Sequence, residues 1–314
     1  MGDKTIPGVD DFTNANFIDS LMNSENGQVK QASAGAGDYI RDKLRESAVF
    51  PNIIPPVNKN YDQLTYYPGE ELGVVVDEYE PGSASSMGVP FGGAASSIQF
   101  RGIRFTTGFG KEVTAEYTKL IDELAGYTMD LRQVVTDNAL KDMDNRQDGT
   151  FFASIDTLCG SSTGVGLSGA QQHFAYQGQV SRRSYADALN NLTRLDVPQG
   201  VWVIADVTAN EWIGMGREEW GDDFAGDVFR KGLSGAMSKL ELVGVPHIST
   251  IKRQHVPHRR VYQFTTPQFM GRHYILQGVQ MYVERKDDLV RWYATRKYGA
   301  RIANLRAACI QDWV

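Results

Sequence analysis

Apolar residues recur at intervals of three or four along one long stretch in the middle of the chain. This period gives a helix a single apolar stripe. The stripe comprises Leu131, Val134, Val135, Ala139, Leu140, Met143, Phe151, Phe152, Ile155 and Leu158. Asp130 lies in the first turn, where the helix dipole favours an acidic side chain, and Gly149 is a weak position inside the helix. The pattern predicts a long helix from Thr128 to Cys159, ended by Gly160 and followed by a loop over 161–169.

A strand-like pattern precedes this helix. Residues 61–67 and 71–79 are rich in β-branched and aromatic side chains, which favours two strands. Apolar residues alternate again over 98–105, with a change of phase at Arg101–Gly102 that indicates a bulge. Between these strands, 14 of the 17 residues from Pro81 to Ser97 are Gly, Ala, Ser or Pro. Because a hairpin alone is marginal in water, we expect a long hairpin with a flexible tip that packs on another molecule.

The segments on either side of the hairpin carry weaker patterns. Residues 1–37 are polar and predict an extended arm, and Asp38 is expected to cap a short helix from Tyr39 to Ser47. Residues 50–57 contain three prolines. Because each proline pushes its predecessor out of the helical region, this stretch is expected to be extended. Residues 114–124 predict a helix.

Helix and strand patterns alternate through the second half of the chain. Helices are predicted over 185–195, 207–215 and 224–240. Strands are predicted over 201–205, 245–251, 261–264, 274–276, 279–284, 289–292 and 307–311. The chain has no internal repeat, and this order of elements indicates an α+β fold.

Composition and charge exclude several classes of protein. The chain has 314 residues, of which 41% are hydrophobic and 22% charged, as in an ordinary globular protein. Proteins whose main function is to bind nucleic acid are normally basic, so the net charge of −6 argues against that class. The apolar runs are too short to span a bilayer, and the polar start of the chain has no signal-peptide pattern. Cys159 and Cys309, the two cysteines, are expected to be reduced thiols.

Possible catalytic or metal-binding residues are few. The glycine-rich loop Gly160–Gly169 lacks the Gly-Lys-Ser/Thr ending of a phosphate-binding loop and follows a helix rather than a strand. His255 and His258 have ligand-like spacing, but Pro257 prevents a helical pair and no cysteine or acid joins them. Cys159 lies at the end of an apolar stripe, where a cysteine usually fills the core. We therefore expect no enzyme activity, no cofactor and no metal site.

The order of these elements resembles the major capsid proteins of tailed bacteriophages, which share the Hong Kong 97 phage capsid fold. Four stretches carry the resemblance: Asp38–Ser47, Ile53–Pro56, Met129–Asp142 and Tyr298–Ala307. It covers nearly the whole chain and implies an α+β fold with an N-terminal arm, a long hairpin called the E-loop, a spine helix, and peripheral and axial domains. The implied boundaries are 1–36 for the arm, 37–57 for a short helix and linker, 58–110 for the E-loop, 111–179 for the spine helix and peripheral domain, 180–275 for the axial domain, and 276–314 for C-terminal strands that return to the peripheral domain.

The resemblance also implies a function and partners. The chain would be a shell subunit that assembles into pentamers and hexamers of an icosahedral head around double-stranded DNA, which contacts the inner face without sequence specificity. It would be made in the bacterial host cytoplasm and become part of the virion. Its partners would be a separate scaffolding protein, a portal and, where the phage has one, a decoration protein. No membrane would be involved. The arm is too short for a fused scaffolding domain, so either a separate scaffold exists or this is the mature form of the subunit. The alternatives are an encapsulin-like cellular shell that encloses enzyme cargo, and a cytoplasmic thiol enzyme using Cys159.

One departure from the family concerns covalent cross-links. In the type member, a lysine of the E-loop joins an asparagine of a neighbouring subunit. Here no lysine occurs from Asn60 to Gly110, so the shell is expected to be held without such links, unless Lys59 or Lys111 takes that role.

Charge is unevenly distributed along the chain. Residues 1–80 hold 14 acidic and 6 basic side chains, whereas residues 247–314 hold 12 Lys or Arg against 4 Asp or Glu. We expect acids of the E-loop to pair with bases near the C-terminus of a neighbouring subunit. The expected acids are Glu70, Glu71, Asp77, Glu78 and Glu80, and the expected bases are Arg291, Arg296, Lys297 and Arg301. The alternative is that the basic groups face the interior of the shell and the DNA.

Overall fold

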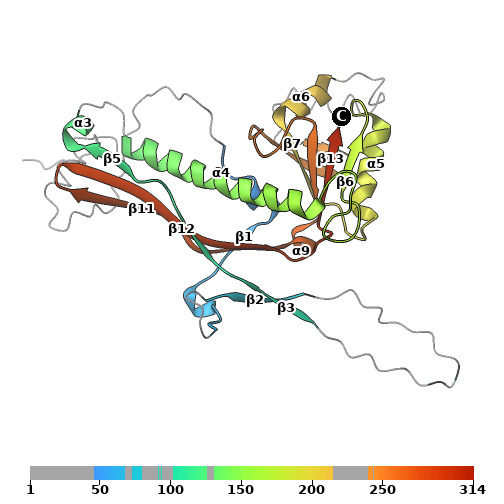
Figure 1. The fold of residues 1–314 in the computed structure, drawn as a ribbon, viewed down its shortest axis with the longest axis horizontal. Helices are drawn as coiled ribbons and strands as arrows, with labels where there is room; N and C mark the ends of the chain where they lie inside the picture. The colour runs from blue at the N-terminus through green and yellow to red at the C-terminus, as the bar shows by residue number, and fades with distance from the viewer. Residues whose placement is uncertain are drawn as a thin grey trace, which may run out of the picture.

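The computed structural model describes residues 46–67, 73–79, 91, 93, 102–125, 131–214, 240–242 and 244–314. Within them, two β-sheets are joined by one long helix, α4 (Leu131–Cys159), which runs along the first sheet and ends against the second (Figure 1). The arm over 1–36, the bulge at Arg101–Gly102 and the helix predicted over 224–240 lie outside the described residues, apart from Gly102 and Leu240.

The predicted long helix is confirmed, and its apolar stripe explains its position. The first half of the stripe, at Ala139 and Met143, packs on Ala294 of the first sheet. The second half packs on the second sheet, where Ile155 is fully buried with Phe264. Gly149 does not interrupt the helix. A side chain there would meet the ring of His255 at 2.8 Å, so the helix needs a glycine at this position to let His255 approach.

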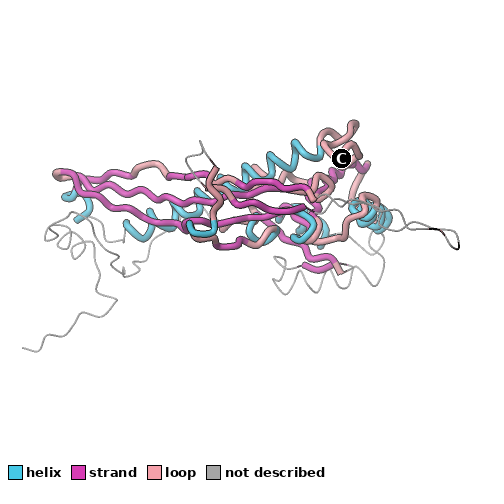
Figure 2. The backbone as a smooth tube through the Cα atoms, turned by 90° about the horizontal axis from the view of Figure 1, so that it is seen from below, coloured by secondary structure: helices cyan, strands magenta, loops and turns pink. Residues whose placement is uncertain are grey.

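The first sheet has five strands and forms the long axis of the molecule (Figure 2). Its centre is an antiparallel pair, β11 (Gly271–Lys286) and β12 (Leu289–Ile302). The predicted strands over 274–276 and 279–284 are therefore one strand, with an irregular register between Ile275 and Gln280. The sheet is completed by β1 (Pro56–Asn58) on β11, and by β4 (Gly110–Val113) and β5 (Tyr117–Leu120) on β12.

The second sheet has six strands in the order β6–β13–β10–β7–β9–β8. Their bounds are His173–Tyr176, Ala308–Trp313, Arg260–Phe264, Val201–Ala205, Val245–Thr250 and Leu240–Leu242. Helix α4 covers one face of this sheet, and α5 (Arg182–Thr193) and α6 (Asp206–Gly214) cover the other. Ser181 caps α5 through the backbone N–H of Ser184. The strands and helices predicted in this part of the chain are confirmed, apart from the helix over 224–240.

The hairpin is confirmed as a two-stranded antiparallel sheet of its own. It is formed by β2 (Val75–Tyr79) and β3 (Ile103–Thr107), which extend away from the first sheet (Figure 1). Of the tip between them, only Phe91, Gly93 and Gly102 are described, and the side chain of Phe91 is fully exposed.

Three local predictions were wrong, and a fourth can be compared only at its end. Residues Phe50–Ile53 form a short helix, α2, because Pro51 lies in its first turn, where a missing N–H costs nothing. Tyr61–Gln63 form a 3₁₀ turn rather than a strand. The stretch over 114–124 becomes β5 and the short helix α3 (Ile121–Ala125), since β12 offers β5 an edge to pair with. In the helix predicted over 39–47, the two described residues, Glu46 and Ser47, are not helical.

The two sheets divide the C-terminal region differently from the predicted domains. Strand β12 belongs to the first sheet with β11. Strand β13, however, lies in the second sheet between β6 and β10, beside strands of the range predicted for the axial domain. The last strand therefore does not return to the first sheet. A short helix, α9 (Pro267–Met270), precedes β11 at the point where the chain passes from one sheet to the other.

Candidate assembly surfaces

The root of the hairpin is held on the first sheet by polar side chains. The hydroxyl of Tyr274 donates to Oδ1 of Asp77 at 2.6 Å, and the hydroxyl of Thr107 reaches Oδ2 at 3.5 Å. Burial and the hydrogen bond to Asp77 raise the pKa of Tyr274. Asp77, predicted to pair with a neighbouring subunit, therefore has partners within its own chain.

Two of the predicted basic residues also have partners within their own subunit. Nη1 of Arg301 donates to the carbonyl of Thr106 at 2.5 Å, and its guanidinium lies over the ring of Phe105 at 5.1 Å. Nζ of Lys297 donates to the hydroxyl of Tyr61 at 3.0 Å. Arg301 thus ties β12 to the hairpin, whereas Lys297 ties β12 to the 3₁₀ turn at Tyr61.

A close backbone approach also holds the hairpin root. Gly299 of β12 lies against Gly108, which joins β3 to β4, and a Cβ on Gly299 would meet the carbonyl oxygen of Gly108 at 2.3 Å. No larger residue fits at position 299 without pushing the two segments apart. The hairpin root is therefore defined by backbone packing as well as by side chains.

Glu78 points away from this root. Its carboxylate pairs with Nε of Arg104 across the hairpin at 3.0 Å, and the two side chains are 71% and 75% exposed. Exposed pairs of this kind contribute only about 0–1 kcal/mol, so Glu78 is free to exchange its partner. Glu70, Glu71 and Glu80, which were expected to act with it, lie outside the described residues.

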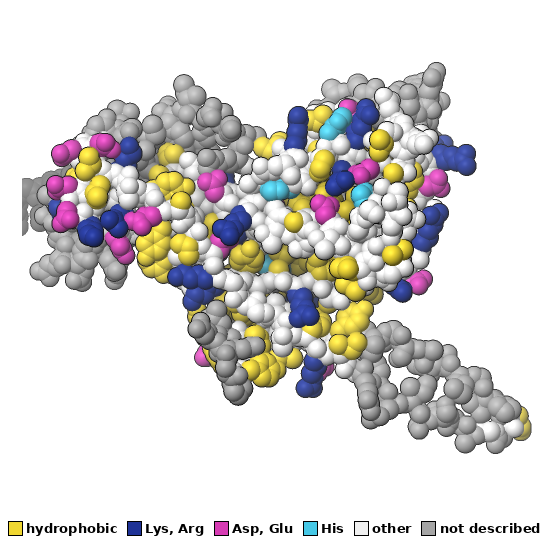
Figure 3. Space-filling model, in the orientation of Figure 1, with side chains coloured by type: hydrophobic (Ala, Val, Ile, Leu, Met, Phe, Trp, Pro, Cys, Tyr) yellow, Lys and Arg dark blue, Asp and Glu magenta, His cyan; other side chains and the backbone are white. Residues whose placement is uncertain are grey.

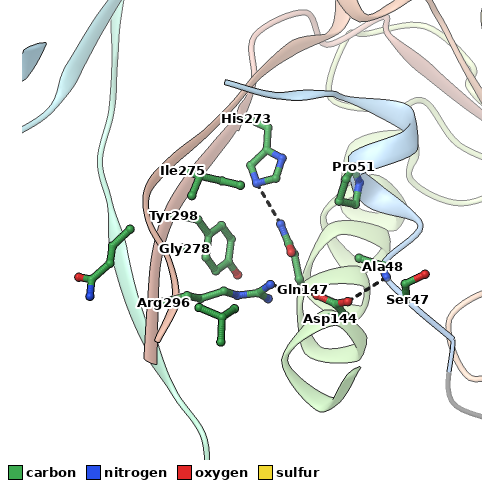
Figure 4. Close-up of a pocket in the computed structure, with 12 residues that line it drawn as sticks. Ser47, Ala48, Pro51, Asp144, Gln147, His273, Ile275, Gly278, Arg296 and Tyr298 are labelled. Carbon is green, nitrogen blue, oxygen red and sulfur yellow. Dashed lines mark hydrogen bonds and ion pairs between the residues drawn. The ribbon is translucent and has the colours of Figure 1, made fainter. Parts of the chain in front are cut away.

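Arg296 is buried between the first sheet and α4 (Figure 4). Its guanidinium donates to Glu112 at 2.7 Å, to Asp144 at 3.1 Å and to the carbonyl of Met143 at 2.8 Å. The ring of Tyr298 lies 4.9 Å from the guanidinium. All of these partners belong to the same chain, so Arg296 joins α4 to the sheet and has no free face for a neighbour.

A cavity of about 320 Å³ lies beside Arg296 (Figure 4). On its wall, Gln147 of α4 contacts Nε2 of His273 of β11 at 3.1 Å. Burial lowers the pKa of His273 to about 4, so its ring is neutral at physiological pH. Neutral and buried, this histidine acts as a structural contact between α4 and the sheet.

Arg291 lies toward the far end of the first sheet, where charged side chains of both signs gather (Figure 3). Its Nη1 pairs with Glu116 at 3.1 Å, and Lys119 pairs with Glu123 nearby at 3.1 Å. These side chains are partly exposed. Arg291 is thus available at the surface, although it has a partner in its own chain.

A buried ion pair holds residues 47–50 against α4. The carboxylate of Asp148 on α4 accepts the N–H groups of Val49 and Phe50 at 2.9–3.0 Å and pairs with Nζ of Lys252 at 2.6 Å. Lys252 also donates to the carbonyl of Ser47 at 2.8 Å. Sequence reasoning missed both residues, because no local pattern marks a lysine that folds back on an aspartate so far along the chain.

The candidate catalytic groups have structural partners. Cys159 is fully buried with its Sγ on the carbonyl of Ala308 at 3.5 Å, and burial raises the pKa of its thiol strongly. His258 pairs with Glu211 at 2.8 Å, and His255 contacts Asn145 at 3.0 Å. In the described ranges, no three His, Cys, Asp or Glu side chains gather as a metal site would require. No helix among the described residues is long and apolar enough to cross a bilayer.

Comparison with known proteins identifies the fold. No protein-family model and no curated protein matches the chain. The capsid structure of the cyanophage P-SCSP1u matches 94% of this chain and 98% of its own, with a TM-score of 0.60 and 11% identity. The structure of the Microbacterium phage Oxtober96 has the same coverage and TM-score at 9% identity. The capsid of an empty GTA particle matches 91% of this chain and 95% of its own, with a TM-score of 0.57 and 13% identity.

These matches confirm the fold that the sequence resemblance implied. The identities are too low to show more than architecture, but the coverage of both chains is nearly complete. The chain has the phage major capsid fold. That α4 is the spine helix of this fold, and the β2–β3 hairpin the stem of its E-loop, stays a prediction.

Proposed function

We propose that this chain is a major capsid protein that assembles into the pentamers and hexamers of an icosahedral tailed-phage head enclosing double-stranded DNA. The observation that carries the proposal is a fold match to phage capsid structures over nearly the full length of both chains. The hairpin supports it, because a two-stranded sheet is marginal in water without a partner surface. Contacts between unlike surfaces that close on themselves give rings, and rings can tile a shell.

Part of the interface would be electrostatic. Glu78, with Glu70, Glu71 and Glu80, would pair with exposed bases of a neighbouring subunit, among them Arg291 and the outer faces of Lys297 and Arg301. The exposure of Glu78 and of its partner Arg104 supports this for the acidic side. Arg296 and Asp77 are left out of the set, because Arg296 is buried and Asp77 is partly buried under the hydroxyl of Tyr274. In the competing arrangement, the basic groups face the packaged DNA.

The proposal includes partners and a place of action. The subunit would assemble with copies of itself in the bacterial host cytoplasm, guided by a separate scaffolding protein and closed by a portal. The mature shell would form the virion head, with DNA bound to its inner face through charge and without sequence specificity. No covalent link through the E-loop is expected, since that segment has no lysine.

The contents of purified particles test this function against its nearest competitor. The chain, produced together with the other head proteins of its phage, should yield particles that protect double-stranded DNA from nuclease. A denaturing gel of these particles should show the subunit as a single band. Particles that enclose a folded enzyme and no DNA would instead indicate an encapsulin-like compartment. A ladder of bands that resists reductant would show that another lysine, such as Lys59 or Lys111, forms cross-links.

A further inference from the structure

His173 connects the end of α4 to the second sheet through both of its ring nitrogens. Nδ1 lies 2.9 Å from the carbonyl oxygen of Gly160, the residue that follows the last turn of α4. Nε2 lies 2.8 Å from Oδ2 of Asp312 on β13. The side chain of His173 is only 10% exposed.

Both neighbours of this ring can only accept hydrogen bonds. A carbonyl oxygen has no proton to give, and Asp312 is ionised because two donors surround it. A neutral imidazole has a single N–H, whereas the imidazolium has two. Only the protonated ring can therefore donate to Gly160 and to Asp312 at the same time.

The charged groups around the ring favour its protonated form. Hydrogen bonding to Asp312 raises the pKa of His173, with a smaller contribution from the carbonyl of Gly160, while burial and the charge of Arg260 oppose it. Burial would raise the pKa of Asp312, but hydrogen bonds from His173 and Arg260 lower it to about 2. Arg260 of β10 binds both oxygens of Asp312 at 2.7 and 3.0 Å and lies 3.6 Å from Asp156 of α4. Tyr262 of β10 also donates to Asp156, at 3.0 Å.

Gly160 makes this contact sensitive to small changes. Its φ of 71° turns the chain sharply out of α4 into the loop over 161–172. That loop is held on the helix by few backbone bonds, such as the one from the N–H of Leu167 to the carbonyl of Leu158 at 2.9 Å. A donor on the carbonyl of Gly160 therefore helps to fix the position of the loop relative to the second sheet.

We propose that His173 is a proton-operated latch between α4 and the second sheet. With the ring protonated, the end of α4, β6 and β13 are held together through Gly160 and Asp312. When the proton leaves, the charge of Asp312 keeps the remaining hydrogen on Nε2, and the carbonyl of Gly160 loses its donor. The junction should therefore be tight at mildly acidic pH and looser at mildly alkaline pH.

The sign of this effect follows from linkage. A histidine whose pKa is raised in the folded state stabilises that state below its unfolded pKa, near 6.5, and the stabilisation is lost as the pH rises through the folded pKa. His255 and His273 cannot act in this way, because burial lowers the pKa of each.

Nuclear magnetic resonance on the full-length unassembled subunit tests the latch directly. The ring nitrogens of His173 should titrate above the pH of an ordinary histidine, and the neutral form should carry its hydrogen on Nε2. Over about pH 5.5–8.5, which spans the titration of histidine, the amides of Gly160 and Leu167 should lose protection against hydrogen exchange after correction for intrinsic rates. A ring that titrates at or below the ordinary value, or that keeps its hydrogen on Nδ1, would overturn the proposal.

Variants separate the latch from a merely structural role. His173→Gln should remove the pH dependence of exchange at Gly160 and Leu167, and Asp312→Asn should lower the pH at which His173 titrates. His258→Gln is the matched control, since His258 also contacts a carboxylate but lies away from Gly160. The same pH dependence in wild type and in His173→Gln would refute the latch. If His173→Gln does not fold, the proposal is tested by the titration of the His173 ring in the wild-type protein and in Asp312→Asn. A ring that titrates at the same pH in both proteins would then refute the latch.

Discussion

Arg296 illustrates how burial changes the meaning of a charged residue. Counted along the sequence, it is one member of a basic C-terminal region. In the fold, it lies under α4 with Glu112 and Asp144, and its side chain is only 10% exposed. Removing one member of a buried ion pair usually costs several kcal/mol, because the remaining charge is left uncompensated. Sequence reasoning identified the excess of charge but could not separate buried from exposed bases, since the carboxylates that decide it lie far away along the chain.

Arg296→Met should therefore lower the free energy of unfolding by about 3–5 kcal/mol. Arg291→Met is the matched control, because its pair with Glu116 is partly exposed and should be worth about 0–1 kcal/mol. Urea unfolding of the subunit measures both values. Equal losses in the two variants would show that Arg296 does not have the buried role described above.

The two cysteines should be inert in the folded protein. Both are fully buried, and burial raises the pKa of the Cys309 thiol to about 12 and that of Cys159 further. Because the thiolate is the reactive form, a thiol reagent at neutral pH should label neither residue until the protein is unfolded. Rapid labelling of Cys159 in the native subunit would reopen the thiol-enzyme hypothesis.

The elements differ in how much of each could be predicted from sequence. The long helix was predicted with its observed end at Cys159, because its apolar stripe is local in the sequence. The strand β5 was mistaken for part of a helix, since the edge of β12 that it pairs with lies far along the chain. Helix α2 was missed because the carboxylate that accepts its first N–H groups, Asp148, belongs to α4. Local sequence patterns thus predicted most helices and strands. The wrong predictions concern segments whose conformation depends on a partner far away along the chain.

The contact between Gly299 and Gly108 predicts a steric effect at the hairpin root. Gly299→Ala should destabilise the subunit by about 1–3 kcal/mol, since the new methyl group would press on the carbonyl of Gly108. Gly278→Ala, on the neighbouring strand β11, is the matched control, because a Cβ there meets nothing within 4 Å. Thermal unfolding compares the two. A Gly299→Ala protein as stable as the Gly278→Ala protein would contradict the close approach.

The exposed acid of the hairpin predicts an assembly effect. Glu78→Lys should impair assembly, because the reversed charge would repel the bases proposed on a neighbouring subunit, and the defect should shrink as salt screens charges over about 8 Å. Arg104→Ala is the control, since it removes the partner of Glu78 within the hairpin but leaves the acid in place. Sedimentation of assembly reactions measures the effect. Normal assembly of Glu78→Lys at every salt concentration would favour bases that face DNA instead.

At the scale of the whole molecule, one long helix connects two sheets that differ in what packs on them. The first sheet carries the hairpin root and the mixed-charge end, while the second forms a compact unit with helices on both faces. The order of elements predicted an α+β fold, and the family resemblance implied its architecture, whereas the long strands β11 and β12 were predicted only as short pieces. The path of the last strand could not be predicted, since β13 has an apolar pattern that would suit either sheet.

Electron microscopy of the full-length protein assembled with its scaffold addresses the shell directly. The capsid assignment predicts closed, symmetric particles built from fivefold and sixfold clusters, in which the β2–β3 hairpin of each subunit lies on a neighbour. Only monomers or open, irregular aggregates, seen under conditions in which the subunit is folded and the scaffold is active, would contradict it.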